Sequence, residues 1–365
     1  MKILLAPDSF KGSLTAHKAA CAMREGLFAA RTDLDVVLHP MADGGEGALE
    51  VLVPFLDGET LEMDIPGMNG KPMKVPVLQF RAVSNQTAWL IESAQIIGLT
   101  LPSVQSIPVL ERSSAPLGGL IRRGLSIGIR CFYLALGGSA TNDGGIGLLS
   151  ELGMCLKNGA GEILPPVISS MPVVHQADIS GLDTRIRECN LHLILDVDNP
   201  LLGKNGATHA YGPQKGIKPD KVDDVEDWMQ QWSACVEQGF GCNVAKKTGA
   251  GAAGGLGFVL FLLGAKAHAG ATFVATLGKL GKRISGCDWV ITGEGKSDAQ
   301  TLHGKVPAVV ADLAHHAGAK VALISGRIEK NIPFHKMFDA LIQVSQDHMP
   351  VDQAMARANK LLMEA

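Results

Sequence analysis

The sequence predicts an α/β protein in which both ends of the chain form one parallel sheet and the middle forms an inserted second domain. At 365 residues the chain is too long for one compact core. Short apolar runs alternate with helical patterns at both ends, as in a buried parallel sheet. From about residue 60, proline and glycine punctuate short segments instead. We place the domains at residues 1–62 plus 270–365 and at 63–269, and expect a functional cleft between them.

The chain opens with two strand, loop and helix units. The apolar run 3–6 ends at a polar loop, 7–13, and the run 36–38 ends at a second polar loop, 40–47. Apolar residues at helical spacing follow each loop. Because the carboxyl ends of parallel strands share one edge of a sheet, we expect the two loops to face one crevice.

The middle of the chain predicts hairpins first and further strands later. Segments 74–80 and 87–91 are short and bounded by turn residues, which favours antiparallel pairing. The runs 131–136 and 192–195 are two more strands, and both end at polar segments. An amphipathic helix follows at 222–236.

The last third returns to the alternation of strands and helices. We expect strands at 289–291, 321–324 and 341–344, with helices near 306–316 and 351–364. These strands complete the sheet that the first two begin.

Composition excludes several classes of function. A net charge of −3 and only two tyrosines give neither the charge nor the stacking surface that nucleic acid requires. No apolar run approaches the ~18 residues of a membrane helix, and the N-terminal run is too short for a signal peptide. Seven scattered cysteines without a Cys-x-x-Cys pair indicate reduced thiols. We expect a cytoplasmic protein without nucleic-acid or membrane partners; the oligomeric state stays open and a homodimer is compatible with the sequence.

Near residue 293 we expect a buried strand to end and the polar residues after it to line the cleft. The apolar run 289–291 is predicted to stop at a turn, Gly293-Glu294-Gly295, in which glycine adopts positive φ and lets a ligand approach the main chain. Carboxylates, hydroxyls and ammonium groups follow within a dozen residues, including Lys296 and Lys305. The alternative is an ordinary polar loop.

One glycine-rich segment, 249–254, matches G-x-G-x-x-G. A dinucleotide site is rejected, because the preceding residues are polar and basic and no acid follows before Asp288. Two interpretations stay open, namely a phosphate cradle and close helix packing.

A second segment, 137–145, offers main-chain amides and hydroxyls to phosphate, and its Asp143 is able to hold magnesium. The alternative is a turn with Ser139 or Thr141 as the helix N-cap. The P-loop pattern is absent from the chain, so a nucleotide enzyme would have to bind phosphate in another way.

Carboxylates gather at the predicted strand ends. Several that converge on one crevice usually bind a divalent cation or activate a hydroxyl. Taken singly, each has an alternative as a cap or turn residue. The seven are Asp8, Asp43, Glu46, Asp196, Asp198, Glu294 and Asp298.

In order along the chain, six segments resemble the successive motifs of the bacterial glycerate kinase family, of the glycerate 2-kinase type. They are 6–14, 40–47, 137–145, 196–200, 249–257 and 292–301. The resemblance implies a flavodoxin-like domain with a second α/β domain inserted in it. It also implies ATP-dependent phosphorylation of D-glycerate, usually to 2-phosphoglycerate. Lys296 stands where some relatives have arginine, and either supplies positive charge.

Phosphoryl transfer needs substrates held in position, a magnesium ion, cations that neutralise the charge of the transferred group, and a group that orients the attacking hydroxyl. We expect Asp196 to accept the proton of the C2 hydroxyl. Three carboxylates are expected to hold or orient Mg²⁺: Asp43, Glu46 and Asp198. Three lysines are expected to cover phosphate or the glycerate carboxylate: Lys11, Lys296 and Lys305. The other predicted substrate and phosphate residues are Asp8, Ser9, Gly138, Ser139, Thr141, Asn142, Gly249, Gly251, Glu294 and Asp298.

Two rival functions stay open. One is a kinase for a different small hydroxy or sugar acid on the same scaffold. The other is a non-catalytic sensor that binds a nucleotide or a carboxylate without consuming ATP. An absent G-x-S-x-G elbow argues against a hydrolase.

Overall fold

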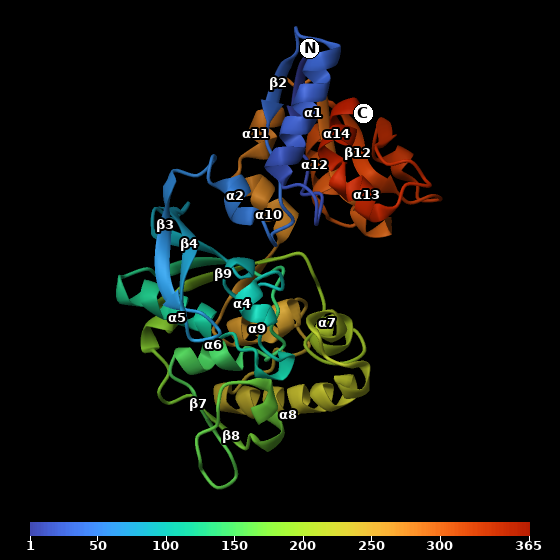
Figure 1. Cartoon of the computed structure of the whole chain (residues 1–365). Helices are drawn as coiled ribbons and strands as arrows, with labels where there is room; N and C mark the ends of the chain where they lie inside the picture. The colour runs from blue at the N-terminus through green and yellow to red at the C-terminus, as the bar shows by residue number, and fades with distance from the viewer. The chain divides into compact units, whose positions relative to one another are not determined.

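The computed structural model describes residues 1–365 and divides into two compact units. Unit 1 comprises Met1–Leu56 and Ala269–Ala365, and unit 2 comprises Asp57–His268. In Figure 1, unit 1 carries the blue and red ends of the chain, and the middle colours belong to unit 2. No helix is both long and apolar enough to cross a membrane.

Unit 1 is built on five parallel strands in the order β13-β12-β11-β1-β2. Their bounds are Lys2–Leu5 for β1, Asp35–Leu38 for β2, Trp289–Ser297 for β11, Lys320–Ile328 for β12 and Ala340–Gln343 for β13. Renumbered within the unit, this order is 2-1-3-4-5, which is the flavodoxin-like order. The prediction that two opening and three closing strands form one parallel sheet is confirmed.

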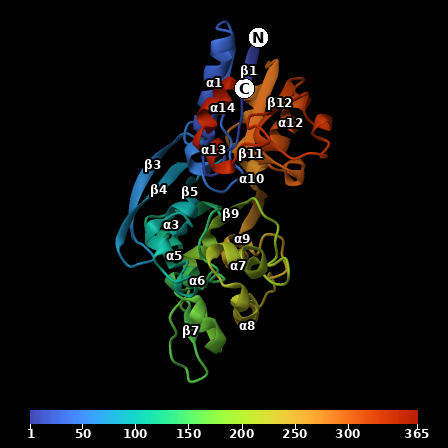
Figure 2. The same ribbon diagram turned by 45° about the vertical axis from the view of Figure 1, so that its right-hand side comes forward.

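Helices cover both faces of this sheet. Helix α1 (Ala16–Ala30) packs against α14 (Ala358–Glu364) over one face, and α12 (Val306–His316) packs against β11 and β12 on the other (Figure 2). This burial of both faces explains why the strands are continuous apolar runs. The other helices of the unit are α2 (Ala48–Leu52), α10 (Gly270–Leu277), α11 (Leu280–Ile284) and α13 (Val351–Ala356).

Strand β11 is longer than predicted, and the expected turn at residues 293–295 is wrong. The strand continues to Ser297, paired with β12, and neither Gly293 nor Gly295 has a positive φ. Glycine is needed at Gly293 because a Cβ there would collide with the carbonyl oxygen of Ile324. Glu294, Lys296 and Ser297 therefore lie on a strand rather than in a loop.

Unit 2 contains a six-stranded mixed sheet in the order β10-β9-β6-β5-β4-β3. The predicted hairpins are confirmed, because β3, β4 and β5 pair antiparallel, and β5, β6 and β9 continue in parallel. Strand β3 spans residue 62, where the sequence suggested the first boundary. The bounds are Gly58–Pro66 (β3), Pro72–Arg81 (β4), Thr87–Glu92 (β5), Cys131–Ala135 (β6), Asn190–Leu195 (β9) and Lys266–Ala269 (β10), with a separate pair at Cys155–Lys157 (β7) and Gln176–Asp178 (β8).

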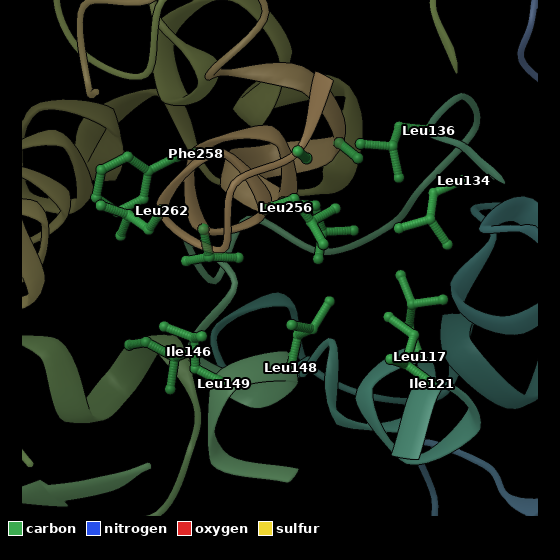
Figure 3. Packing of buried hydrophobic residues seen from close by; sticks show 14 of the residues in the cluster. Leu117, Ile121, Leu134, Leu136, Ile146, Leu148, Leu149, Leu256, Phe258 and Leu262 are labelled. Carbon is green, nitrogen blue, oxygen red and sulfur yellow. The ribbon is translucent and has the colours of Figure 1, made fainter. Parts of the chain in front are cut away.

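The core of unit 2 lies between this sheet and its helices. Figure 3 shows Leu134 and Leu136 near Leu117 and Ile121 of α5, with Leu256 of α9 beside them. Each fully buried side chain of this kind contributes about 1.5–3 kcal/mol. The helices are α3 (Ala94–Ile97), α4 (Pro102–Gln105), α5 (Ala115–Ser126), α6 (Ile146–Glu151), α7 (Ala207–Lys215), α8 (Val222–Phe240) and α9 (Ala252–Leu262). Short 3₁₀ turns in the two units occupy Val109–Glu111, Ile168–Val173, Thr184–Glu188, Pro219–Lys221, Ala299–Leu302 and Phe334–Lys336.

Candidate active site

A pocket of about 470 Å³ opens in unit 1 beside the carboxyl ends of β1 and β11. The helices that follow these neighbouring strands cover opposite faces of the sheet, so the pocket lies at the topological switch point, where α/β proteins bind ligands. The pocket brings together eight of the predicted residues. They are Asp8, Ser9, Lys11, Asp43, Glu294, Lys296, Asp298 and Lys305.

Three buried carboxylates line the pocket. Asp8, Asp43 and Glu294 are only 6%, 8% and 7% exposed. Burial, followed by the negative charge of Asp43, raises the pKa of Asp8 well above its ordinary value, although the amide of Ser9 donates to its carboxylate at 2.7 Å. A cation bound here would relieve this repulsion.

Glu294 is fixed by two hydroxyl groups. The side chains of Thr301 and Ser297 donate to its Oε1 at 2.6 and 2.9 Å. Burial raises its pKa, and the two hydroxyls and Lys305 oppose that effect. Asp298 caps the following 3₁₀ turn by accepting the amide of Gln300 at 2.9 Å. These hydrogen bonds orient both carboxylates in the pocket wall.

Exposed cations surround these carboxylates. The Nζ of Lys11 lies 2.9 Å from Asp43 Oδ2 and that of Lys296 lies 3.7 Å from Asp298 Oδ2, while the two lysine side chains are 73% and 61% exposed. Arg327 stands opposite Lys296 across β11 and β12 and also lines the pocket. Exposed ion pairs are worth only about 0–1 kcal/mol, so a ligand can readily recruit these groups.

The three predicted metal ligands do not lie together in one site. Asp43 lies in the pocket, Glu46 is exposed outside its lining, and Asp198 belongs to unit 2. No group of three or more His, Cys, Asp or Glu side chains is arranged to hold a metal ion. Magnesium, however, commonly takes one or two carboxylates and completes its shell with water and phosphate oxygens. Asp8 and Asp43 fit that requirement.

In unit 2, the segment 137–145 links β6 to α6 and is organised around Asp143. The carboxylate of Asp143 accepts four hydrogen bonds, from the amide and hydroxyl of Ser114 at 2.7 and 2.8 Å and from the amides of Gly145 and Gly147. These donors occupy the carboxylate, so Asp143 shapes the loop. Among the predicted residues here, Gly138 is exposed, and Ser139, Thr141 and Asn142 are buried.

Lys215, at the end of α7, supports this loop and was missed by the sequence analysis. Its Nζ donates to the carbonyl oxygen of Thr141 at 2.8 Å and to Ser139 Oγ at 3.3 Å. The side chain is buried, and burial lowers its pKa to about 7. Its partners lie more than 70 positions away in sequence, so no local pattern indicated them.

Lys215 predicts a specific pH dependence of stability. The pKa of Lys215 is about 7 in the folded protein and about 10.4 in the unfolded chain. Between these two pH values Lys215 is protonated in the unfolded chain but not in the folded protein, so the free energy of unfolding rises with pH. Relative to Lys215→Met, we expect wild type to gain up to about 1.4 kcal/mol per pH unit from pH 7 to 9 in urea titrations. The charges of Asp143 and Arg112 also act on Lys215, so a change in either charge over this pH range must be followed separately. The exposed Lys218→Met is the control, and parallel curves for wild type and Lys215→Met would contradict the prediction.

Asp196 and Asp198 are exposed just after β9. Beside them, Tyr211 Oη donates to Asn199 Oδ1 at 2.5 Å. Burial and then the charges of the two aspartates raise the pKa of Tyr211. Asp196 therefore lies at a strand end, as predicted, with an exposed side chain, and its role in catalysis stays a prediction.

The glycine-rich segment lies against the same loop. The amide of Gly249 donates to the carbonyl oxygen of Asp198 at 3.2 Å, and that of Gly251 to Asn199 at 2.9 Å. A Cβ at Gly251 would collide with the carbonyl oxygen of Pro200, and one at Gly254 with that of Thr141. Close packing thus accounts for these glycines, and their contact with phosphate stays a prediction.

Comparisons with known proteins agree on one family. The model of the Glycerate kinase family matches residues 3–365. The chain is 36% identical over 361 residues to "Glycerate kinase" of Bacillus subtilis (strain 168), covering 98% of this chain and 94% of the relative. It is 36% identical over 333 residues to "Glycerate 2-kinase" of Escherichia coli (strain K12), covering 91% and 87%. A crystal structure described as a candidate glycerate kinase 2 from Salmonella typhimurium LT2 matches with a TM-score of 0.80 at 33% identity, over 100% of this chain and 96% of that one.

Proposed function

This chain belongs to the glycerate kinase family and is a kinase, and from that premise we propose that it transfers the γ-phosphoryl group of ATP to D-glycerate, giving 2-phosphoglycerate and ADP. The observation that carries the proposal is the pocket of unit 1, where buried carboxylates and exposed lysines meet at the switch point of the sheet. Such a combination suits magnesium and phosphate. The cytoplasm, where ATP is available, is the proposed location.

The proposed reaction divides its roles among named groups. The C2 oxygen of glycerate bonds to the γ-phosphorus while the bond to the β–γ bridging oxygen breaks, and that electron pair leaves with ADP. Asp196 accepts the proton of the C2 hydroxyl. Lys11, Lys296 and Lys305 cover the charge of phosphate or of the glycerate carboxylate.

Magnesium, when bound, supplies charge neutralisation at the phosphate oxygens. Asp8 and Asp43 are the side chains best suited to hold it, because both are buried in the lining of one pocket and a cation would relieve the repulsion between their charges. Glu46 and Asp198 are the further predicted ligands. In unit 2, Lys215 keeps the loop of Ser139 and Thr141 in place through its hydrogen bonds.

The test is release of ADP by the purified protein with MgATP and a panel of acids that includes both glycerate enantiomers. We expect D-glycerate to be the preferred acceptor. The ³¹P NMR spectrum of the product then identifies the position, since phosphorus on C2 couples to one proton and phosphorus on C3 to two. Turnover with another acid instead of glycerate would indicate a different kinase. Ligand binding without ADP release would indicate a sensor.

A further inference from the structure

The pocket of unit 1 is too large for glycerate alone. Its volume of about 470 Å³ lies in the range of about 300–1,000 Å³ that sites for drug-sized ligands have. A three-carbon acid would leave most of this space unfilled, whereas a nucleotide would occupy it.

The lining of the pocket combines charged and apolar groups. Besides the carboxylates and lysines described above, it contains six apolar residues of the C-terminal segment, which we call the apolar wall: Val344, Met349, Val351, Ala354, Met355 and Leu361. Glycerate has no apolar part to place against this wall, but the base and ribose of a nucleotide have broad faces that benefit from apolar cover.

Two features bear on the access of a ligand to the apolar wall. Val351 is 62% exposed at the start of α13, so its apolar side chain is available to a ligand in the pocket. Met355 lies so close to Gly12 that a Cβ there would collide with its terminal methyl group. Gly12, with φ of +79°, thus lets the loop after β1 and helix α13 close together around the pocket.

The charges of the lining suit a chain of phosphate groups. Four cations line the pocket, namely Lys11, Lys296, Lys305 and Arg327. The guanidinium of Arg327 is oriented by the carbonyl oxygen of Asp347 at 3.3 Å. An anion with several charged groups can contact cations spread over β11, β12 and the loop after β1 at once, which a single carboxylate cannot do.

We propose that the pocket of unit 1 is the nucleotide site of this kinase, with the base and ribose against Val351, Met355 and Leu361 and the phosphates toward Lys11, Lys305 and Arg327. The proposal rests on the proposed function for the presence of ATP. It adds which ligand this pocket takes, and it assigns the C-terminal segment 344–361 a role in binding.

The test is calorimetric titration of the full-length protein with MgADP. In Val351→Asp and Met355→Asp we expect the dissociation constant to rise about tenfold or more, because a carboxylate would be buried against the base. Val351→Ser, which adds no charge, should weaken binding by several-fold. Val173→Asp in unit 2 is the matched control, since Val173 is also an exposed apolar residue, at 55%, and should bind MgADP as wild type does. Because Val351 is exposed, its replacement should leave folding intact.

Steady-state kinetics then separates this proposal from the function itself. We expect the KM for ATP to rise in the pocket variants while the KM for D-glycerate stays within about twofold. A raised KM for glycerate with unchanged MgADP binding would show that the pocket holds the acid, and unchanged values for both would show that it holds neither; either result overturns the proposal. If wild type binds MgADP and the variants do not, yet no acid is phosphorylated, the site stands and the kinase reaction fails.

Discussion

Asp196→Asn is expected to lower kcat by roughly 10²–10⁴ while the protein stays folded. The side chain is exposed at the end of β9, so the replacement creates no cavity in the core. Asparagine keeps the size of aspartate but cannot accept the proton of the C2 hydroxyl. The KM values should change much less than kcat, since the lost interaction is made mainly in the transition state.

The measurement is steady-state ADP release together with a thermal unfolding curve for each variant. Asp220→Asn, an exposed aspartate in the same unit, serves as the control and should retain full activity. Turnover near the wild-type value would remove Asp196 from the mechanism.

Gly254→Ala is expected to destabilise unit 2 by about 3 kcal/mol or more. The residue has φ of +69°, which is costly for alanine, and its new methyl group would collide with the carbonyl oxygen of Thr141. This contact cannot relax cheaply, because the carbonyl oxygen of Thr141 belongs to buried backbone. The carbonyl oxygen of Gly254 also accepts the amide of Gly144 at 2.9 Å, so the change should disturb the loop of 137–145 as well.

Differential scanning calorimetry with MgATP kinetics checks this expectation. Gly281→Ala is the matched control, because Gly281 lies in helix α11 with no atom near its missing Cβ and no positive φ. That variant should be unchanged or slightly more stable, by up to about 1 kcal/mol. Equal unfolding temperatures for the two variants would show that the glycine at 254 is not required by packing.

Much of unit 1 could be predicted, because its strands are short, apolar and each followed by polar residues at the same edge of the sheet. That rule placed Asp8, Asp43 and Glu294 in one pocket from three distant segments. The same rule, applied to β12 and β13, points to Arg327 and Val344, which the sequence analysis overlooked. The rule did not predict the length of β11. Glycine stands at position 293 because β12 comes too close for a side chain, and this contact cannot be read from the local sequence.

In unit 2 the features that were missed depend on contacts between distant residues. A buried lysine such as Lys215 looks like any surface lysine in the sequence, because its partners come from another loop. For the glycines at 249 and 251 the sequence left open a phosphate cradle or close packing, and it did not indicate that their amides donate to carbonyl groups after β9. The spacing of apolar residues predicts which face of a helix or strand is apolar. It does not show which hydrogen-bond donors already have a partner within the protein.

Unit 1 is built from two separate parts of the chain, so it cannot finish folding until the second part has been synthesised. Strands β1 and β2 leave the ribosome first, but β1 pairs with β11, and the hydroxyl of Thr292 donates to Ala6 across 286 positions. The nascent chain must therefore carry two unprotected apolar strands while the contiguous residues 57–268 emerge and fold. A polypeptide terminated before Trp289 would keep an open strand edge permanently, and we expect it to aggregate rather than accumulate as a stable fragment.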